Sequence, residues 1–212
     1  MNSATQRLLL SGPAGQIEVV CDHPPLATEE APKGTVFISH PHPLFGGTMD
    51  NKVVQTLARA YLTCGWKAVR FNFRGVGQSQ GVHDNGTGEC QDLLALVREL
   101  APQGPLALAG FSFGAFVTTH AVATLQTERE LANVVLVGTA ASRFDVAAVP
   151  DALHDKTLVI HGEHDDTVAL AAVLDWARPQ LLPVVVVPGG GHFFHGQLPL
   201  LKRLVVRHLH AG

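Results

Sequence analysis

Two segments of the chain match the pattern Gly-x-Ser-x-Gly, in which a serine can act as a nucleophile. They are Gly77-Gln78-Ser79-Gln80-Gly81 and Gly110-Phe111-Ser112-Phe113-Gly114. The chemistry needs the serine on a sharp turn between a buried strand and a helix, so that its hydroxyl projects above the sheet. Ser112 follows an apolar run and precedes a helical pattern, whereas Ser79 lies in a polar, glycine-rich segment. We therefore predict Ser112 as the nucleophile and a surface loop around Ser79.

A serine hydroxyl is a weak nucleophile at neutral pH and needs an imidazole beside it, which a carboxylate holds in the right tautomer. One apolar run leads into His161-Gly162-Glu163-His164-Asp165-Asp166, and the next leads into Gly189-Gly190-Gly191-His192. Ligand-facing residues of open α/β sheets gather where the strands end. Asp165 and His192 are therefore candidates for the acid and the base that would activate Ser112.

The elements that must position these residues are short apolar runs alternating with longer helical patterns, from about residue 35 onward. This rhythm is typical of strand–helix–strand units, and runs that are apolar at consecutive positions favour a parallel sheet covered on both faces. Two runs around Gly12-Pro13-Ala14-Gly15 predict a hairpin at one edge. The sequence predicts a three-layer α/β/α sandwich with about eight strands and five helices, in a single domain over residues 1–212. Asp50 is the predicted cap of the first helix.

The order Ser, Asp, His along the chain is that of α/β-hydrolases. A second motif is the segment His40-Pro41-His42-Pro43-Leu44-Phe45-Gly46-Gly47-Thr48-Met49-Asp50-Asn51. With these motifs the chain resembles the α/β-hydrolase fold superfamily, and within it the small bacterial serine hydrolases related to the dienelactone hydrolases. The resemblance extends over roughly residues 35–200. It implies hydrolysis of an ester or similar acyl bond of a small substrate through an acyl-enzyme, without a cofactor.

The resemblance also implies roles for single residues. The acid is Asp165, which lies three residues after the glycine of its loop; the neighbouring Asp166 and the more remote Asp145 are the alternatives. The base is His192, and His195 is a packing or rim residue.

An acyl-transfer site needs two backbone N–H groups aimed at the negative charge that develops on the substrate oxygen, together called the oxyanion hole. One predicted donor is Phe113, directly after the nucleophile. The other comes from the proline-rich loop, where Pro41 and Pro43 have no N–H to give. His42 is the first candidate there and Leu44 the second.

The chain lengths between strands bear on access to the site. Only residues 142–156 separate the exit of the run 134–137 from the run 158–160. This gap leaves no room for the helical lid that many α/β-hydrolases insert there. We therefore predict an open, lidless site that prefers short acyl groups.

Composition excludes several classes of function. The formal net charge of −3 gives no electrostatic footprint for a nucleic acid or an anionic membrane, and no apolar stretch is long enough for a membrane span. The widely spaced Cys21, Cys64 and Cys90 suggest reduced thiols, and hence a cytoplasmic protein. No feature indicates an oligomeric state.

Two alternatives to a serine hydrolase come from other classes. Twelve histidines suggest a metal-dependent hydrolase, although no His-Glu-x-x-His pattern is present and we predict no metal ligands. A catalytically idle scaffold that keeps the fold to bind a partner is the other alternative.

Overall fold

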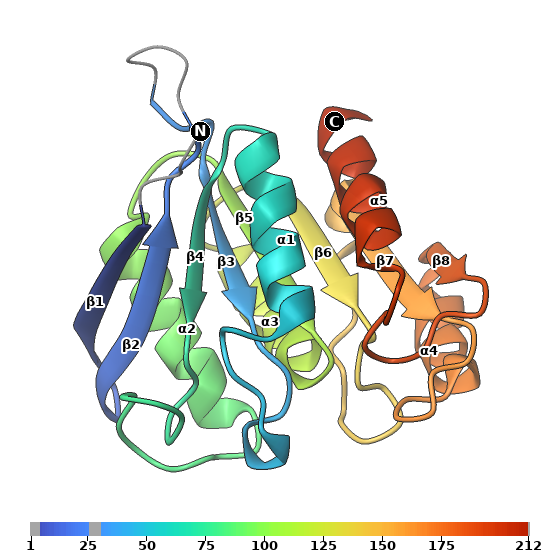
Figure 1. Cartoon of the computed structure of the whole chain (residues 1–212), viewed down its shortest axis with the longest axis horizontal. Helices are drawn as coiled ribbons and strands as arrows, with labels where there is room; N and C mark the ends of the chain where they lie inside the picture. The colour runs from blue at the N-terminus through green and yellow to red at the C-terminus, as the bar shows by residue number, and fades with distance from the viewer. Residues whose placement is uncertain (1–4, 26–30, 212) are drawn as a thin grey trace.

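A sheet of eight strands runs through the centre of the computed structural model, which describes residues 5–25 and 31–211 (Figure 1). The strand order is β1-β2-β4-β3-β5-β6-β7-β8. The edge hairpin β1–β2 is antiparallel, β2 pairs antiparallel with β4, and all other pairs are parallel. The predicted mostly parallel sheet is therefore confirmed. The strands are β1 Thr5–Gly12, β2 Gly15–Asp22, β3 Thr35–Ser39, β4 Lys67–Phe71, β5 Leu106–Phe111, β6 Leu131–Val137, β7 Thr157–Gly162 and β8 Val184–Val187.

Helices cover both faces of this sheet. In Figure 1, α1 and α5 lie in front of the sheet and α2, α3 and α4 lie behind it. The buried residues form two clusters that match this division, one with α1 and α5 and the other with α2, α3 and α4. The predicted three layers are therefore confirmed. The helices are α1 Lys52–Thr63, α2 Thr87–Leu100, α3 Phe113–Leu125, α4 Leu170–Ala177 and α5 Leu198–Ala211.

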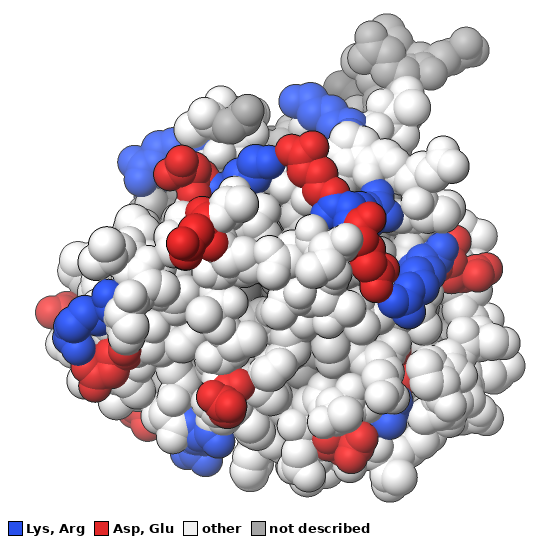
Figure 2. Space-filling model, turned by 180° about the vertical axis from the view of Figure 1, so that it is seen from behind, with Lys and Arg blue, Asp and Glu red and all other residues white. Residues whose placement is uncertain are grey.

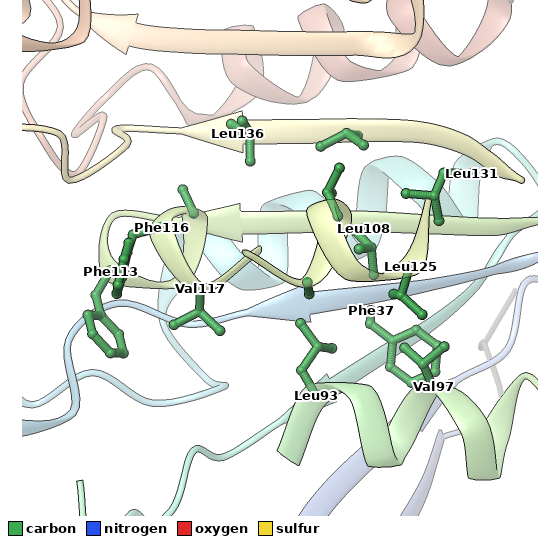
Figure 3. Packing of buried hydrophobic residues seen from close by; sticks show 14 of the residues in the cluster. Phe37, Leu93, Val97, Leu108, Phe113, Phe116, Val117, Leu125, Leu131 and Leu136 are labelled. Carbon is green, nitrogen blue, oxygen red and sulfur yellow. The ribbon is translucent and has the colours of Figure 1, made fainter. Parts of the chain in front are cut away.

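Helix α3 is the most deeply buried of these helices, with ten of its thirteen residues buried. Figure 3 shows why: Leu93 and Val97 of α2 point toward the sheet, where Phe37 of β3 meets them, and Val117 of α3 lies beside this group. A helix that is covered on several sides has apolar residues all around its axis. The packing holds the N-terminus of α3 firmly against the ends of β3 and β5.

The start of α1 differs from the prediction. Asn51, not Asp50, caps the helix, because its Oδ1 accepts the N–H of Val53 at 2.9 Å. Asp50 instead accepts a bond of 3.0 Å from the guanidinium of Arg70, whose other nitrogens donate to Asp22 at 2.9 and 3.1 Å. Arg70 is nearly buried and thus ties strand β2, strand β4 and the start of α1 together.

The connection from β6 to β7 carries no lid. Residues 138–156 contain one short 3₁₀ turn, η2 Asp151–Lys156, and otherwise loop. The predicted absence of a lid is confirmed.

The surface carries charges of both signs. Figure 2 shows the face covered by α2, α3 and α4, where acidic and basic side chains are interspersed among large uncharged areas. Within the described residues, no helix has both the length and the apolar character needed to cross a membrane.

The pair Arg70–Asp22 yields a stability test. Asp22→Ala leaves a nearly buried guanidinium without its main partner, so we expect a loss of about 3 kcal/mol in the free energy of unfolding, measured by urea titration. The matched control is Glu128→Ala, which breaks the exposed pair with Arg98 and should cost less than about 1 kcal/mol. Equal losses in the two variants would contradict the anchoring role of Arg70.

Candidate active site

Ser112 lies on the turn between β5 and α3, with φ 57° and ψ −118°. A Cβ added at Gly110 would lie 2.4 Å from the carbonyl oxygen of Gly114, and one at Gly114 would lie 2.3 Å from the carbonyl oxygen of Ser39. Strand, turn and helix therefore pass closer together than any side chain permits, which explains both glycines. This turn, the nucleophile elbow, leaves Ser112 7% exposed at the carboxyl end of the central strand β5.

The other Gly-x-Ser-x-Gly segment has a structural role. The Ser79 hydroxyl accepts the N–H of Glu18 at 2.9 Å and donates to the carbonyl of Asn72 at 2.7 Å. The prediction of a surface position is wrong for Ser79 itself, which is 6% exposed. Its hydroxyl is buried because it bonds one backbone group of β2 and one of the residue directly after β4.

Three of the predicted site residues form one chain of hydrogen bonds. The Oγ of Ser112 lies 2.9 Å from Nε2 of His192, and Nδ1 of His192 lies 2.7 Å from Oδ2 of Asp165. In the tautomer that satisfies both contacts, Ser112 donates to Nε2 and Nδ1–H donates to the carboxylate. All three residues are buried, so bulk water does not compete strongly for these bonds.

The carboxylate of Asp165 is held on both of its oxygens. Oδ1 accepts the N–H groups of Thr167 and Val168 at 2.9 and 2.7 Å. Oδ2 also faces Nε2 of the buried His161 at 3.5 Å, and that nitrogen bonds the Val168 carbonyl at 2.9 Å. Burial raises the pKa of Asp165, but the bonds from His192 and Val168 lower it by more, so its pKa lies below the ordinary value. The carboxyl group is therefore ionised at neutral pH.

The other acidic and histidine residues considered for this site lie outside the chain of hydrogen bonds. Asp166 is exposed and its Oδ1 bonds the hydroxyl of Thr167 at 3.3 Å. Asp145 is also exposed and touches His120 through its backbone carbonyl. His195 is exposed, with its ring against Phe193.

The N–H groups that were predicted to stabilise an oxyanion lie beside the elbow. Phe113 is the first residue of α3, where an N–H has no partner within the helix. Among the described residues, the N–H of His42 has no hydrogen-bond partner either. The N–H of Leu44 is engaged, because it donates to Nδ1 of His42 at 3.2 Å. The geometry thus favours His42 over Leu44.

The ring of His42 rests on a cluster that the sequence analysis missed. It packs against Phe113 and His83, with ring centroids 4.8 Å away in both cases. Nδ1 of His83 lies 2.9 Å from Oε1 of the fully buried Glu89, and Oε2 of Glu89 accepts the N–H of Gly86 at 2.8 Å. The position of Glu89 three residues after the helix cap was the available sequence signal. The pair of His83 and Glu89 thus supports the loop after β3 that carries His42.

Ser112 and His192 open onto a pocket of about 300 Å³. Its wall is mostly apolar and aromatic, with one cation, Arg143. A larger pocket of about 750 Å³ lies near Pro105 and Arg129, at the amino ends of β5 and β6. We place the function at the smaller pocket, because ligands of open α/β sheets bind at the carboxyl ends of the strands. Its lining residues are Pro41, His42, Phe45, Gly46, Gly47, Asn51, Ser112, Phe113, Ala140, Arg143, Phe144, Thr167, Val168, His192 and Phe193.

Metal ligation was one of the alternative interpretations. Over residues 5–25 and 31–211, no three His, Cys, Asp or Glu side chains gather in a way that could hold a metal ion. His161 bonds a carbonyl, and His164 is exposed beside Glu163.

Comparisons with known proteins place this geometry in a family. A model of the family described as serine aminopeptidase, S33, matches residues 30–145. An α/β serine hydrolase without a lid from Xanthomonas campestris is 36% identical, with a TM-score of 0.87 over 100% of this chain and 96% of that one. An α/β serine hydrolase homologue from Coxiella burnetii is 39% identical, with a TM-score of 0.81 over 99% and 98%.

A curated relative, an uncharacterized protein of Rickettsia prowazekii, is 39% identical over 120 residues. This match spans 55% of the chain and 49% of the relative, so the chain matches only about half the length of that protein. The chain belongs to the serine aminopeptidase S33 family, within the lidless α/β serine hydrolases. The finer resemblance to dienelactone hydrolases stays a prediction.

His40 fixes the start of the loop after β3, and its burial leads to a pH test. Its Nε2 accepts the N–H of Phe73 at 2.9 Å, so the proton is on Nδ1, which donates to the Pro41 carbonyl at 2.6 Å. Burial lowers the pKa of His40 to about 4, despite the bond to Pro41. The folded protein therefore resists protonation at a site where the unfolded chain takes a proton.

Because the unfolded state binds more protons between about pH 6.5 and about pH 4, stability due to His40 is lost as the pH falls through this window. The loss should reach about 3 kcal/mol. We expect the difference in unfolding free energy between the wild type and His40→Gln to shrink by this amount in urea titrations across the window. A difference that stays constant with pH would contradict a neutral, buried His40.

Proposed function

We propose that this protein is a serine hydrolase that cleaves ester or similar acyl bonds of small substrates through an acyl-enzyme. The strongest support is the chain of hydrogen bonds that joins Ser112, His192 and Asp165 beside a pocket of about 300 Å³. Membership in the α/β serine hydrolases agrees with it.

In the proposed mechanism, Ser112 attacks the carbonyl carbon of the substrate while Nε2 of His192 takes the hydroxyl proton. The imidazolium that forms is stabilised by the ionised Asp165 at Nδ1. His192 then gives the proton to the departing alcohol, and the acyl group stays on Ser112. Water, activated by the same nitrogen, releases the acid and restores the serine. No cofactor enters these steps.

The negative charge on the carbonyl oxygen is stabilised by the N–H groups of Phe113 and His42 in this proposal. Pro41 and Pro43 fix φ on both sides of His42, and its Nδ1 bond to Leu44 closes a short turn. The donor is thus held in place before charge develops, which lowers the reorganisation needed in the transition state.

The pocket wall bears on the substrate class. An aminopeptidase, as the family description names it, must accommodate the ammonium group of a peptide N-terminus, for which a carboxylate is the natural partner. Among the described residues that line the pocket there is no Asp or Glu, and the one Lys or Arg there, Arg143, would repel an ammonium. Esters of short acyl groups suit the small apolar pocket better. The free thiols Cys21, Cys64 and Cys90 favour the cytoplasm as the working compartment.

The two serine motifs supply a matched pair of variants. With p-nitrophenyl acetate as substrate, we expect Ser112→Ala to lower kcat by at least about a thousandfold. Ser79→Ala, measured at a temperature where it is folded, should keep turnover of the same order as the wild type. Release of p-nitrophenolate is the measurement, and addition of a chelator should leave it unchanged.

Each alternative function has its own outcome in this assay. Loss of turnover on chelation would favour a metal-dependent hydrolase. Folded wild-type protein without turnover on any short ester would favour an idle binding scaffold. Turnover that survives in Ser112→Ala would contradict the proposed nucleophile.

The oxyanion donor can be tested by a proline substitution, because His42 already has a φ of −54° that proline accepts. His42→Pro removes the N–H and should lower kcat by about a hundredfold or more. His42→Ala, which keeps the N–H but loses the ring and its bond to Leu44, is the control and should retain far more turnover than His42→Pro. If His42→Pro turns over as well as His42→Ala, the donor is Leu44 instead.

A further inference from the structure

Arg143 is the one charged side chain of the Asp, Glu, Lys and Arg types that lines the active-site pocket within the described part of the chain. The rest of the wall is apolar, aromatic or neutral and polar, apart from the imidazoles of His42 and His192. In a small pocket of this kind, a few polar groups set the specificity. Neither the proposed mechanism nor the fold gives Arg143 a task.

The backbone of Arg143 is held above the nucleophile elbow. Its N–H donates to the Ala140 carbonyl at 3.1 Å, in the loop that leaves β6. The same loop begins at Gly138, where a Cβ would lie 3.3 Å from the His192 ring. It continues to Phe144, whose ring centroid lies 5.2 Å from that of Phe113. The loop therefore spans the site from the base to the oxyanion side.

Arg143 differs from the other arginines near this edge of the sheet. Arg70 is paired with Asp22, and Arg74 donates two bonds of 2.8 Å to Asp92. For Arg143, no carboxylate lies within 4.0 Å among residues 5–25 and 31–211. Its side chain is exposed, so the five N–H donors of the guanidinium are free to meet a ligand.

The positive charge of Arg143 affects the pKa of His42, which also lines the pocket. Burial lowers the pKa of His42 first of all, and the charges of His83 and Arg143 lower it further, against the opposing charge of Glu89. Of these effects, the charge of Arg143 by itself disfavours a second positive charge at this position and favours a negative one.

We propose that Arg143 binds a carboxylate on the substrate, so that the preferred substrates are small esters that carry a carboxylate besides the bond to be cleaved. This inference rests on the proposed function. A guanidinium matches a carboxylate in a planar, two-point contact, and such charge-assisted bonds are the stronger hydrogen bonds of proteins. With no competing acid on the wall, the substrate carboxylate is the partner that Arg143 lacks.

Two pairs of esters test the proposal, each matched in shape. On the acyl side they are the p-nitrophenyl esters of p-carboxybenzoic acid and p-carbamoylbenzoic acid; on the alcohol side they are p-carboxyphenyl acetate and p-carbamoylphenyl acetate. Their rigid rings keep the carboxylate from attacking its own ester. Each kcat/KM is divided by the hydroxide-catalysed rate of the same ester, which removes differences in intrinsic reactivity.

In the wild type, we expect the carboxylate member of at least one pair to exceed its carboxamide partner about tenfold or more. Arg143→Gln should bring that ratio close to one. Arg203 is an exposed arginine of α5 that does not line the pocket, and the control variant Arg203→Gln should keep the wild-type ratio. A ratio near one in the wild type for both pairs, or the same ratio in Arg143→Gln, would overturn the proposal.

A binding measurement separates this proposal from the proposed function. Isothermal titration of Ser112→Ala with benzoate and with benzamide needs no turnover. Tighter binding of benzoate that is lost in the double variant with Arg143→Gln supports the carboxylate site, even if no ester is hydrolysed. Equal binding of the two compounds, or benzoate binding that survives in the double variant, overturns it.

Discussion

The close backbone approach at the nucleophile elbow is the constraint on which the rest of the site depends. Gly110 and Gly114 have no side chain, so the end of β5, the start of α3 and the end of β3 lie within a distance that a Cβ would occupy. The same approach sets the position of Ser112 at the carboxyl edge of the sheet and of the Phe113 N–H next to it. It also brings the loop after β3, with His42, against the ring of Phe113.

Other contacts extend this constraint to the loops around the site. His40 joins the loop after β3 to Phe73, two residues beyond the end of β4, and its low pKa keeps it neutral in that position. Glu89, at the start of α2, supports His42 through His83. The ionised Asp165 is held by backbone N–H groups of its own loop, so it can orient His192 without rearranging. Loops of several strands thus converge on one serine.

Much of the fold and the core of the candidate site could be predicted from the sequence, because both depend on local signals. Ser112 follows a buried run and precedes an apolar helix, and His192 follows the last strand of a parallel sheet. Where the prediction failed, a distant partner decided the outcome. Asp50 does not cap α1 because Arg70 binds it, and Ser79 is buried because its hydroxyl bonds the N–H of the distant Glu18 as well as the nearby Asn72 carbonyl. Arg143 could not be assigned to the pocket from the sequence, because the loop after β6 takes its course from contacts with the distant His192 and Phe113.

The central claim, that His192 activates Ser112 as a nucleophile, is tested most directly by reaction with a fluorophosphonate followed by mass spectrometry of the peptides. A fluorophosphonate phosphonylates a serine, with loss of fluoride, only when the hydroxyl is activated, and the test does not require the natural substrate to be known. We expect one adduct, on Ser112, which forms in the presence of a chelator and far more slowly in His192→Ala. Folded protein that stays unlabelled, or an adduct on Ser79 in place of Ser112, would contradict the account.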